Sequence, residues 1–294
     1  ATTRRRNTLL PLSNNYNTRT TKKSSREHKK KINMEHVSAT SITLFQNCQR
    51  RWYERYVLGK KEETTKAMTR GNEVHRQLEN YLEKGVLPDD SNAGQIAEAG
   101  LKHLPEPDPN HRVEQSLDEY PVPNVAIKFK GFIDLLLYSE GKLEVLDHKT
   151  TSNFKYALTE EQLAENTQMV IYARHVLEHI DADEVTLTHV VYLTKPPFQS
   201  KRTSTVVSRE HIYKKFDEIH EIVEQMVASS EKQAIEMEKN RSFCYSYGKK
   251  CPYYKDCAQS LKISSKQMSV LNTLRGIEFS TDLEDAIRRL KSGN

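Results

Sequence analysis

The stretch Gly131-Phe-Ile-Asp-Leu-Leu-Leu-Tyr-Ser-Glu-Gly-Lys-Leu-Glu-Val-Leu-Asp-His-Lys149 has the pattern of two strands joined by a tight turn. Apolar residues fill both halves, and Glu140-Gly141 separates them, with a glycine that can adopt a positive φ. A two-residue turn at this point pairs Ser139 with Lys142. Both faces of the hairpin are apolar, which is typical of central strands covered on both sides. The stretch therefore predicts a buried hairpin in the middle of a sheet.

Acidic side chains meet at the end of this hairpin that lies away from the turn. In the predicted register Asp134 lies opposite Asp147, and Lys149 shares a face with Asp147 because side chains alternate along a strand. Two opposed carboxylates repel each other unless something compensates, and a divalent cation is the natural partner. The alternative is a surface hairpin with solvated charges. The matching register of Asp134 and the apolar surroundings argue against it.

Composition limits the class of protein and locates the basic charge. The 294 residues, 36% hydrophobic and 29% charged, suit one large globular domain or two small ones. No apolar run approaches the roughly 18 residues of a membrane span, and no secretory signal is recognisable. Residues 1–36 hold ten Lys or Arg and two acids, a net charge of +8. Since the whole chain carries +5, the remainder carries −3. The basic excess belongs to the tail and is no evidence that the folded body binds nucleic acid.

Apolar periodicity and capping residues predict the other elements. Residues 1–36 lack such periodicity and are expected to form a disordered basic tail. Helices are expected over Ser38–Gly59, Met68–Lys84, Asn92–Leu104, Thr159–Ile180 and Arg209–Lys239, with two weaker ones over Ser265–Leu274 and Thr281–Leu290. Further strands are expected over His111–Tyr120, Val125–Lys130 and Val185–Leu193.

Helical spacing places certain polar residues together. Gly71 and His75 are four residues apart and so lie on one helix face, where the glycine lets another backbone come close. Gln168 and Tyr172 share a face for the same reason. A lone helical histidine is more often structural or solvated than a ligand. Glu114, on a preceding strand, is either a residue that supports the metal ligands or an ordinary surface residue, and the second interpretation is favoured.

The chain has four cysteines, and three of them are clustered near its end. Cys48 lies in the first predicted helix, and the others follow the pattern Cys244-x6-Cys251-x5-Cys257. Three cysteines so close together in a cysteine-poor chain argue against four unrelated thiols. Zinc sites often use Cys-x-x-Cys, which is absent, whereas an iron–sulfur cluster takes four cysteines without that constraint. Spacing alone leaves both metals open. Either one would tie the first helix to the C-terminal segment.

These motifs, taken in order, resemble those of a known family. Gly71-x-x-x-His75, Gly131-Phe-Ile-Asp134, Asp147-His-Lys149 and Gln168-x-x-x-Tyr172 resemble the RecB-like nucleases of the PD-(D/E)XK superfamily. The opening Cys48-Gln-Arg-Arg-Trp-Tyr-Glu-Arg-Tyr56 looks like that family's first helix. The late cysteines make the chain similar to the iron–sulfur branch, which includes the CRISPR adaptation exonucleases and the nuclease domains of AddAB-type complexes. The likeness spans about residues 38–260.

The resemblance implies an α/β, restriction-endonuclease-like core with a mixed central sheet flanked by helices, plus a cysteine-ligated metal staple. It implies that His75, Asp134 and Asp147 bind Mg²⁺ or Mn²⁺, helped by the main-chain carbonyl of His148. Lys149 would orient or activate the attacking water and stabilise the charged transition state, and Gln168 and Tyr172 would line the DNA side of the site. The staple it implies is a [4Fe–4S] cluster on Cys48, Cys244, Cys251 and Cys257, with Zn²⁺ as the alternative.

The expected function is therefore metal-dependent DNA cleavage, exonucleolytic in kind, in repair, recombination or phage-type DNA processing. The alternative is a catalytically silent DNA-binding or scaffold subunit that keeps the fold and the cluster. We expect a nuclease domain over 37–262 and a helical extension over 263–294. DNA is the expected partner, with a separate helicase or recombination protein and no membrane, in the cytoplasm or another compartment that contains DNA.

Overall fold

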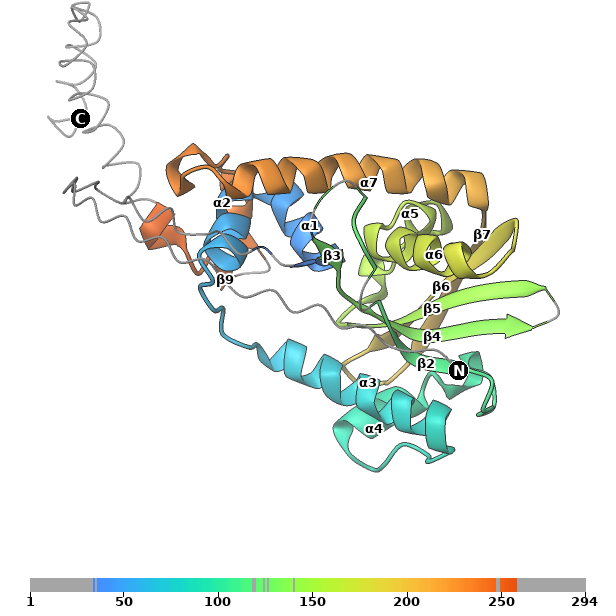
Figure 1. Cartoon of the computed structure of the whole chain (residues 1–294). Coiled ribbons are helices and arrows are strands. Elements are labelled where there is room, and N and C mark those ends of the chain that lie inside the picture. The colour runs from blue at the N-terminus through green and yellow to red at the C-terminus, as the bar shows by residue number, and fades with distance from the viewer. Residues whose placement is uncertain are drawn as a thin grey trace, which may run out of the picture. The chain divides into compact units, whose positions relative to one another are not determined.

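A five-stranded sheet forms the centre of the protein in the computed structural model, which describes residues 34, 36–117, 120–123, 125, 127–139, 141–246 and 249–257. Its order is β2-β4-β5-β6-β7, and only β5 and β6 run parallel (Figure 1). This confirms the predicted mixed sheet. Its strands are β2 (Arg112–Ser116), β4 (Phe132–Ser139), β5 (Lys142–Thr151), β6 (Glu184–Leu193) and β7 (Ser200–Ser208). Two short pairs join β1 (His36–Val37) to β3 (Lys128–Phe129) and β8 (Tyr245–Ser246) to β9 (Lys249–Lys250).

The hairpin of β4 and β5 has the predicted register. Ser139 pairs with Lys142, and the ladder continues to Leu135 opposite Leu146. Gly141 has a φ of 76°, the left-handed conformation that a glycine adopts at no steric cost. The next pair beyond the ladder is Asp134 and Asp147, so the register delivers both carboxylates to the end of the hairpin away from the turn.

Helices cover both faces of this sheet (Figure 1). On one face lie α1 (Ala39–Asn47), α6 (Thr167–His179) and α7 (Arg209–Ser230), and on the other α3 (Lys66–Lys84) and α4 (Asn92–Glu98). Strand β5 contributes to both cores, because Val145 packs on the first side and Leu146 on the second. The predicted apolar faces are therefore each buried under helices, as central strands require.

Two of the predicted long helices are broken, and each break lies beside predicted site residues. The helix expected over 38–59 begins with Ser38 as its cap but stops at Cys48, whose backbone is extended (φ −164°, ψ 102°). It resumes as α2 (Gln49–Trp52) and the wider π-helical turn η1 (Tyr53–Val57). The helix expected over 159–180 is divided into α5 (Glu160–Ala164) and α6, because Asn166 caps the second segment through its side chain.

The remaining elements are short, and the last expected helices lie outside the described residues. The single-turn helices are η2 (Leu101–His103), η3 (Phe154–Tyr156), η4 (Ala234–Glu236) and η5 (Arg241–Cys244). Helix α7 ends at Ser230 rather than near Lys239. The predictions for residues 1–33 and 263–294 fall on parts of the chain that are not described.

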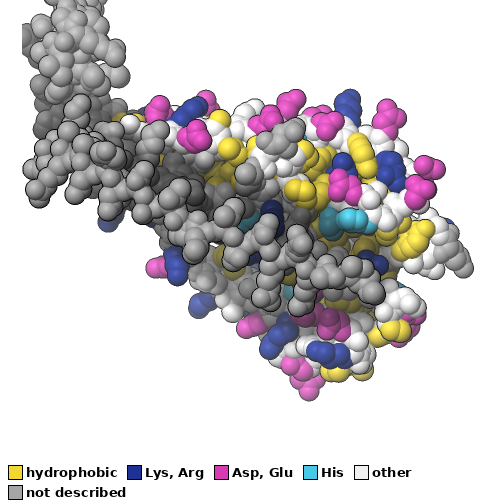
Figure 2. Space-filling model, viewed as in Figure 1, with side chains coloured by type: hydrophobic (Ala, Val, Ile, Leu, Met, Phe, Trp, Pro, Cys, Tyr) yellow, Lys and Arg dark blue, Asp and Glu magenta, His cyan; other side chains and the backbone are white. Residues whose placement is uncertain are grey.

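The outer face of α7 carries charges of both signs. Acidic and basic side chains are interspersed along it in Figure 2, where it forms the upper edge of the molecule. This surface is therefore no basic patch for a polyanion, in keeping with the net charge expected for the folded body. In the described part of the chain, no helix is both long and apolar enough to cross a membrane.

Candidate active site

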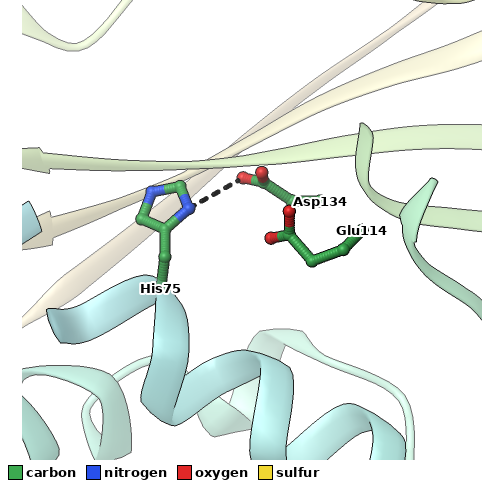
Figure 3. Close-up of side chains that lie close together, drawn as sticks. All are labelled: His75, Glu114 and Asp134. Atoms are coloured by element: carbon green, nitrogen blue, oxygen red, sulfur yellow. Dashed lines mark ion pairs between the residues drawn. The ribbon is translucent and has the colours of Figure 1, made fainter. Parts of the chain in front are cut away.

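Strand pairing brings Glu114 opposite Asp134. Val113 pairs with Leu135 and Gln115 pairs with Ile133. The residues between these positions, Glu114 on β2 and Asp134 on β4, therefore lie opposite each other. Glu114 has a φ of 50°, the only positive value at a non-glycine residue in the described part of the chain. The two carboxylates and His75 of α3 lie within 4.8 Å of one another (Figure 3). The sequence interpretation of Glu114 as an ordinary surface residue was wrong.

Helix α3 can approach the sheet here because Gly71 has no side chain. A Cβ on Gly71 would lie 3.3 Å from the Thr150 hydroxyl oxygen, a tight contact. One turn later, His75 places Nδ1 3.4 Å from Oδ2 of Asp134. Burial alone would lower the pKa of His75, but the hydrogen bond and charge of Asp134 outweigh it and raise that pKa. The predicted pairing of Gly71 and His75 therefore serves the site.

Asp134 is held as a carboxylate by two donors. Burial opposes ionisation, yet His75 and the backbone N–H of His148, 2.6 Å from Oδ2, lower the pKa of Asp134 below its usual value. Asp134 is thus anionic at neutral pH, and the His148 N–H of β5 fixes its orientation.

Asp147 sits in a separate arrangement with Lys149. It is only 1% exposed, and its Oδ2 is 2.6 Å from Nζ of Lys149. Burial raises the pKa of Asp147, and the charge of Asp134 adds to this, while Lys149 opposes it. Asp147 does not belong to the compact group of His75, Glu114 and Asp134. Of the predicted metal ligands, His75 and Asp134 therefore lie in the compact group, whereas Asp147 lies beside it.

Gln168 connects the acid and the lysine. Its Oε1 accepts a hydrogen bond from Lys149 at 2.9 Å, and its Nε2 donates to Oδ1 of Asp147 at 2.8 Å and to the Tyr172 hydroxyl at 2.9 Å. Tyr172 is 5% exposed, and Gly131 makes room for its ring, since a Cβ there would lie 3.1 Å away. The Tyr172 ring is therefore buried, and its hydroxyl contacts the predicted DNA-side residue Gln168.

Two further histidines near the site, His148 and His189, are buried. The His148 ring is buried, with Nδ1 3.0 Å from the Tyr192 hydroxyl, and burial lowers its pKa to about 4. His189, missed from the sequence, is the cross-strand neighbour of Asp147, and its Nε2 lies 3.7 Å from Oδ2 of that residue. Its position next to Asp147 depends on the β5–β6 pairing, which no local pattern in the sequence indicates.

All four cysteines line one cavity. Cys48 reaches it from the break between α1 and α2, while Cys244, Cys251 and Cys257 come from the C-terminal segment. Burial raises the pKa of Cys251, and the nearby Cys48 and Cys244 contribute to the shift. In the described part of the chain, which contains all four cysteines, no three of their sulfurs lie within 4.8 Å of one another. Tetrahedral zinc would place them about 3.8 Å apart.

Glu114 is expected to make the stability of the metal-free protein depend on pH. Burial and the charge of Asp134 raise its pKa to about 7 from 4.5. The folded state then binds a proton more tightly than the unfolded state, so this stabilisation is complete below about pH 4.5 and is lost as pH rises through 7. In EDTA, we expect the melting temperature to fall more steeply between about pH 5 and 7.5 in the wild type than in Glu114→Gln. The exposed Glu98→Gln should match the wild type, and equal slopes in all three proteins would contradict the placement.

Comparison with known proteins identifies the family. The sequence model of the PD-(D/E)XK nuclease superfamily matches residues 36–120 and 106–258. With well over half of the chain covered and the motif residues gathered at one end of the sheet, the protein belongs to the PD-(D/E)XK nuclease superfamily. No curated protein matches the sequence.

Solved structures similar to this chain include three of low identity. SSO0001 is 18% identical over 67% of this chain and 77% of its own, with a TM-score of 0.37. A candidate exonuclease from Eubacterium rectale is 11% identical over 75% and 90%, with a TM-score of 0.46. LHK-Exo, in complex with dAMP, is 14% identical over 66% and 89%, with a TM-score of 0.37. These values are too low to transfer a function.

Proposed function

We propose that this protein is a metal-dependent DNA exonuclease of the RecB-like branch, with its nuclease domain over 37–262. The observation that carries the proposal is the Lys149–Asp147–Gln168 arrangement beside the His75–Glu114–Asp134 group. A buried carboxylate paired with a half-exposed ammonium, next to three metal-binding side chains, is a costly arrangement that a fold alone does not need.

The donor set suits a hard divalent cation. Carboxylate oxygens and an imidazole fit Mg²⁺ or Mn²⁺. His75, Glu114 and Asp134 would hold the ion, and Asp147, with the main-chain carbonyl of His148, would complete the site from β5. When bound, the ion polarises a phosphoryl oxygen and lowers the pKa of a water ligand.

The chain's own residues supply positioning and charge. Lys149, fixed between Asp147 and Gln168, places a positive charge where negative charge develops on the phosphate, and it orients the attacking water. Gln168, on α6, holds the side chains of Lys149 and Asp147 in place through its two hydrogen bonds. The Tyr172 hydroxyl, by accepting from Gln168, fixes the amide in that orientation.

The cysteine cavity supports a [4Fe–4S] cluster as the second metal centre. Four thiols line one cavity, so the number of donors fits a cluster of this kind. Zinc is the alternative. Placement in the iron–sulfur branch, in DNA repair or recombination, and beside a helicase follows from the motif resemblance.

The direct test is DNA digestion. Purified protein is incubated with end-labelled single- and double-stranded DNA in Mg²⁺, Mn²⁺ or EDTA. We expect release of mononucleotides or short products from one end, with either metal and not with EDTA. Protein that binds DNA but leaves it intact in both metals would instead be the silent scaffold subunit.

Gln168 provides a prediction that separates positioning from metal binding. Gln168→Leu removes both hydrogen bonds that hold Lys149 and Asp147 in register, so we expect cleavage to fall about 10²-fold. Mn²⁺ affinity, measured by calorimetry, should change little because Gln168 is no ligand. As a control, Gln225→Leu alters an exposed amide on α7. Lost Mn²⁺ affinity in Gln168→Leu would contradict this placement.

A further inference from the structure

A groove with a mixed polar and apolar lining includes Gln168. It has a volume of about 370 Å³ and is formed between α1, α2 and η1 on one side and the start of α6 on the other. Its lining includes Thr40, Thr43, Asn47, Arg51 and Arg55. These residues recur every three or four positions, so they form one stripe along the first helical segments, continuing past the break at Cys48.

The groove shares one residue, Gln168, with the candidate active site. Gln168 lines it and also contacts Lys149 and Asp147. A chain lying in the groove would therefore reach the site at the residue that positions the lysine. A strand in the groove would therefore extend from the side of Lys149 toward Arg55.

The electrostatics of the groove favour an anion. Arg51 contacts Glu62 with two nitrogens, both at 3.1 Å, and Arg55 contacts the same carboxylate at 3.2 Å. Two guanidinium groups share one carboxylate, which leaves a net positive charge. Hydroxyl and amide groups supply further hydrogen bonds, the usual partners of phosphate oxygens.

The lining also indicates which part of a nucleic acid the groove would contact. None of the residues that line the groove is aromatic, so it offers no platform for base stacking. Its volume is near the lower end of the range for small-ligand sites, which suits a nucleotide of one strand rather than a duplex.

We infer that this groove holds the sugar–phosphate backbone of one DNA strand next to the cleaved bond, without reading its sequence. The inference rests on the proposed nuclease function and adds the path of the strand, with Arg55 as a phosphate contact. Arg51 is the less suitable residue to test, because it also lines the cysteine cavity.

The test compares Arg55→Gln with a matched control. Arg202→Gln removes an arginine that also contacts a single carboxylate, Glu144, but lies on β7 outside the groove. Binding of a fluorescent single strand is measured by anisotropy in EDTA at several salt concentrations, and cleavage in Mg²⁺ is measured in parallel. Melting temperatures verify that both variants are folded.

For Arg55→Gln we expect about tenfold weaker binding, a salt slope smaller by about 0.7, and a raised KM with kcat nearly unchanged. Glu62→Gln should have the opposite effect on binding, because it removes the carboxylate that competes with phosphate. A series of strands is made in which one uncharged methylphosphonate replaces the phosphate at each position in turn. At the position that contacts Arg55, the replacement should weaken binding to the wild type but should not weaken binding to Arg55→Gln any further.

Several outcomes would overturn the inference. It falls if Arg55→Gln behaves like Arg202→Gln, or if no methylphosphonate position shows the interaction with Arg55. Wild-type protein that binds the strand but does not cleave it would remove the proposed enzyme function, while the binding comparison would still decide the groove. Wild-type protein that does not bind the strand at all would refute both.

Discussion

Replacing Lys149 with alanine is expected to lower the single-turnover rate of DNA cleavage about 10³-fold or more. The ammonium lies 2.6 Å from Oδ2 of the buried Asp147, and Gln168 fixes it there. Losing a preorganised group of this kind typically costs 10² to 10³ in rate, and here the orientation of water is lost as well. The rate is measured with end-labelled DNA in saturating Mg²⁺.

Two comparisons make this result specific. Lys142→Ala changes an exposed lysine on the same strand and should cleave like the wild type. Asp134→Asn should lose both the rate and Mn²⁺ affinity, because it removes an anionic ligand, whereas Lys149→Ala should keep Mn²⁺ affinity. A Lys149→Ala protein that digests DNA at the wild-type rate would refute the assignment of the active site.

Removing one cysteine is expected to have the second large effect, on stability. Cys48 and the 244–257 segment lie about two hundred residues apart in the sequence, yet they line one cavity. Losing the proposed cluster in Cys251→Ser should therefore lower the melting temperature by about 10 °C or more, with loss of bound iron. Protein purified without oxygen is assayed for colour, iron and acid-labile sulfide, and its melting is followed by circular dichroism.

A control variant tests whether the effect is specific to the cysteines, and the metal content of the wild type tests the cluster. Lys249→Ala changes an exposed residue close to the cavity and should keep both iron and stability. Stoichiometric zinc without iron in the wild-type protein would refute the cluster. It would leave the proposed nuclease standing, because the compact group of His75, Glu114 and Asp134 includes no cysteine.

Local patterns were enough to predict the centre of the fold. The register of β4 and β5 follows from one turn and from apolar residues on both faces, and Asp134 and Asp147 then fall at the same end. Ser38 begins the first helix, and the approach of Gly71 to the sheet is real, because each depends only on near neighbours in the sequence.

Features that depend on distant pairing were not predictable. Glu114 reaches the site only because β2 pairs with β4, and its charge looked like an ordinary surface charge. Strand β7 was missed because it lies at the sheet edge, where only Thr203 and Val207 are buried and the pattern is mostly polar. The break at Cys48 was also missed, because periodicity continues through it.

The β4–β5 hairpin separates its turn from its functional end by the full length of the strands. Ser139, Gly141 and Lys142 are exposed, and a side chain added at Gly141 would meet no other atom within 4 Å. A dye attached to a cysteine at Lys142, or a short epitope inserted beside Gly141, would therefore sit far from Asp134 and Asp147. The hairpin tip is thus a natural attachment point for tethering the protein to a surface or following single molecules on DNA.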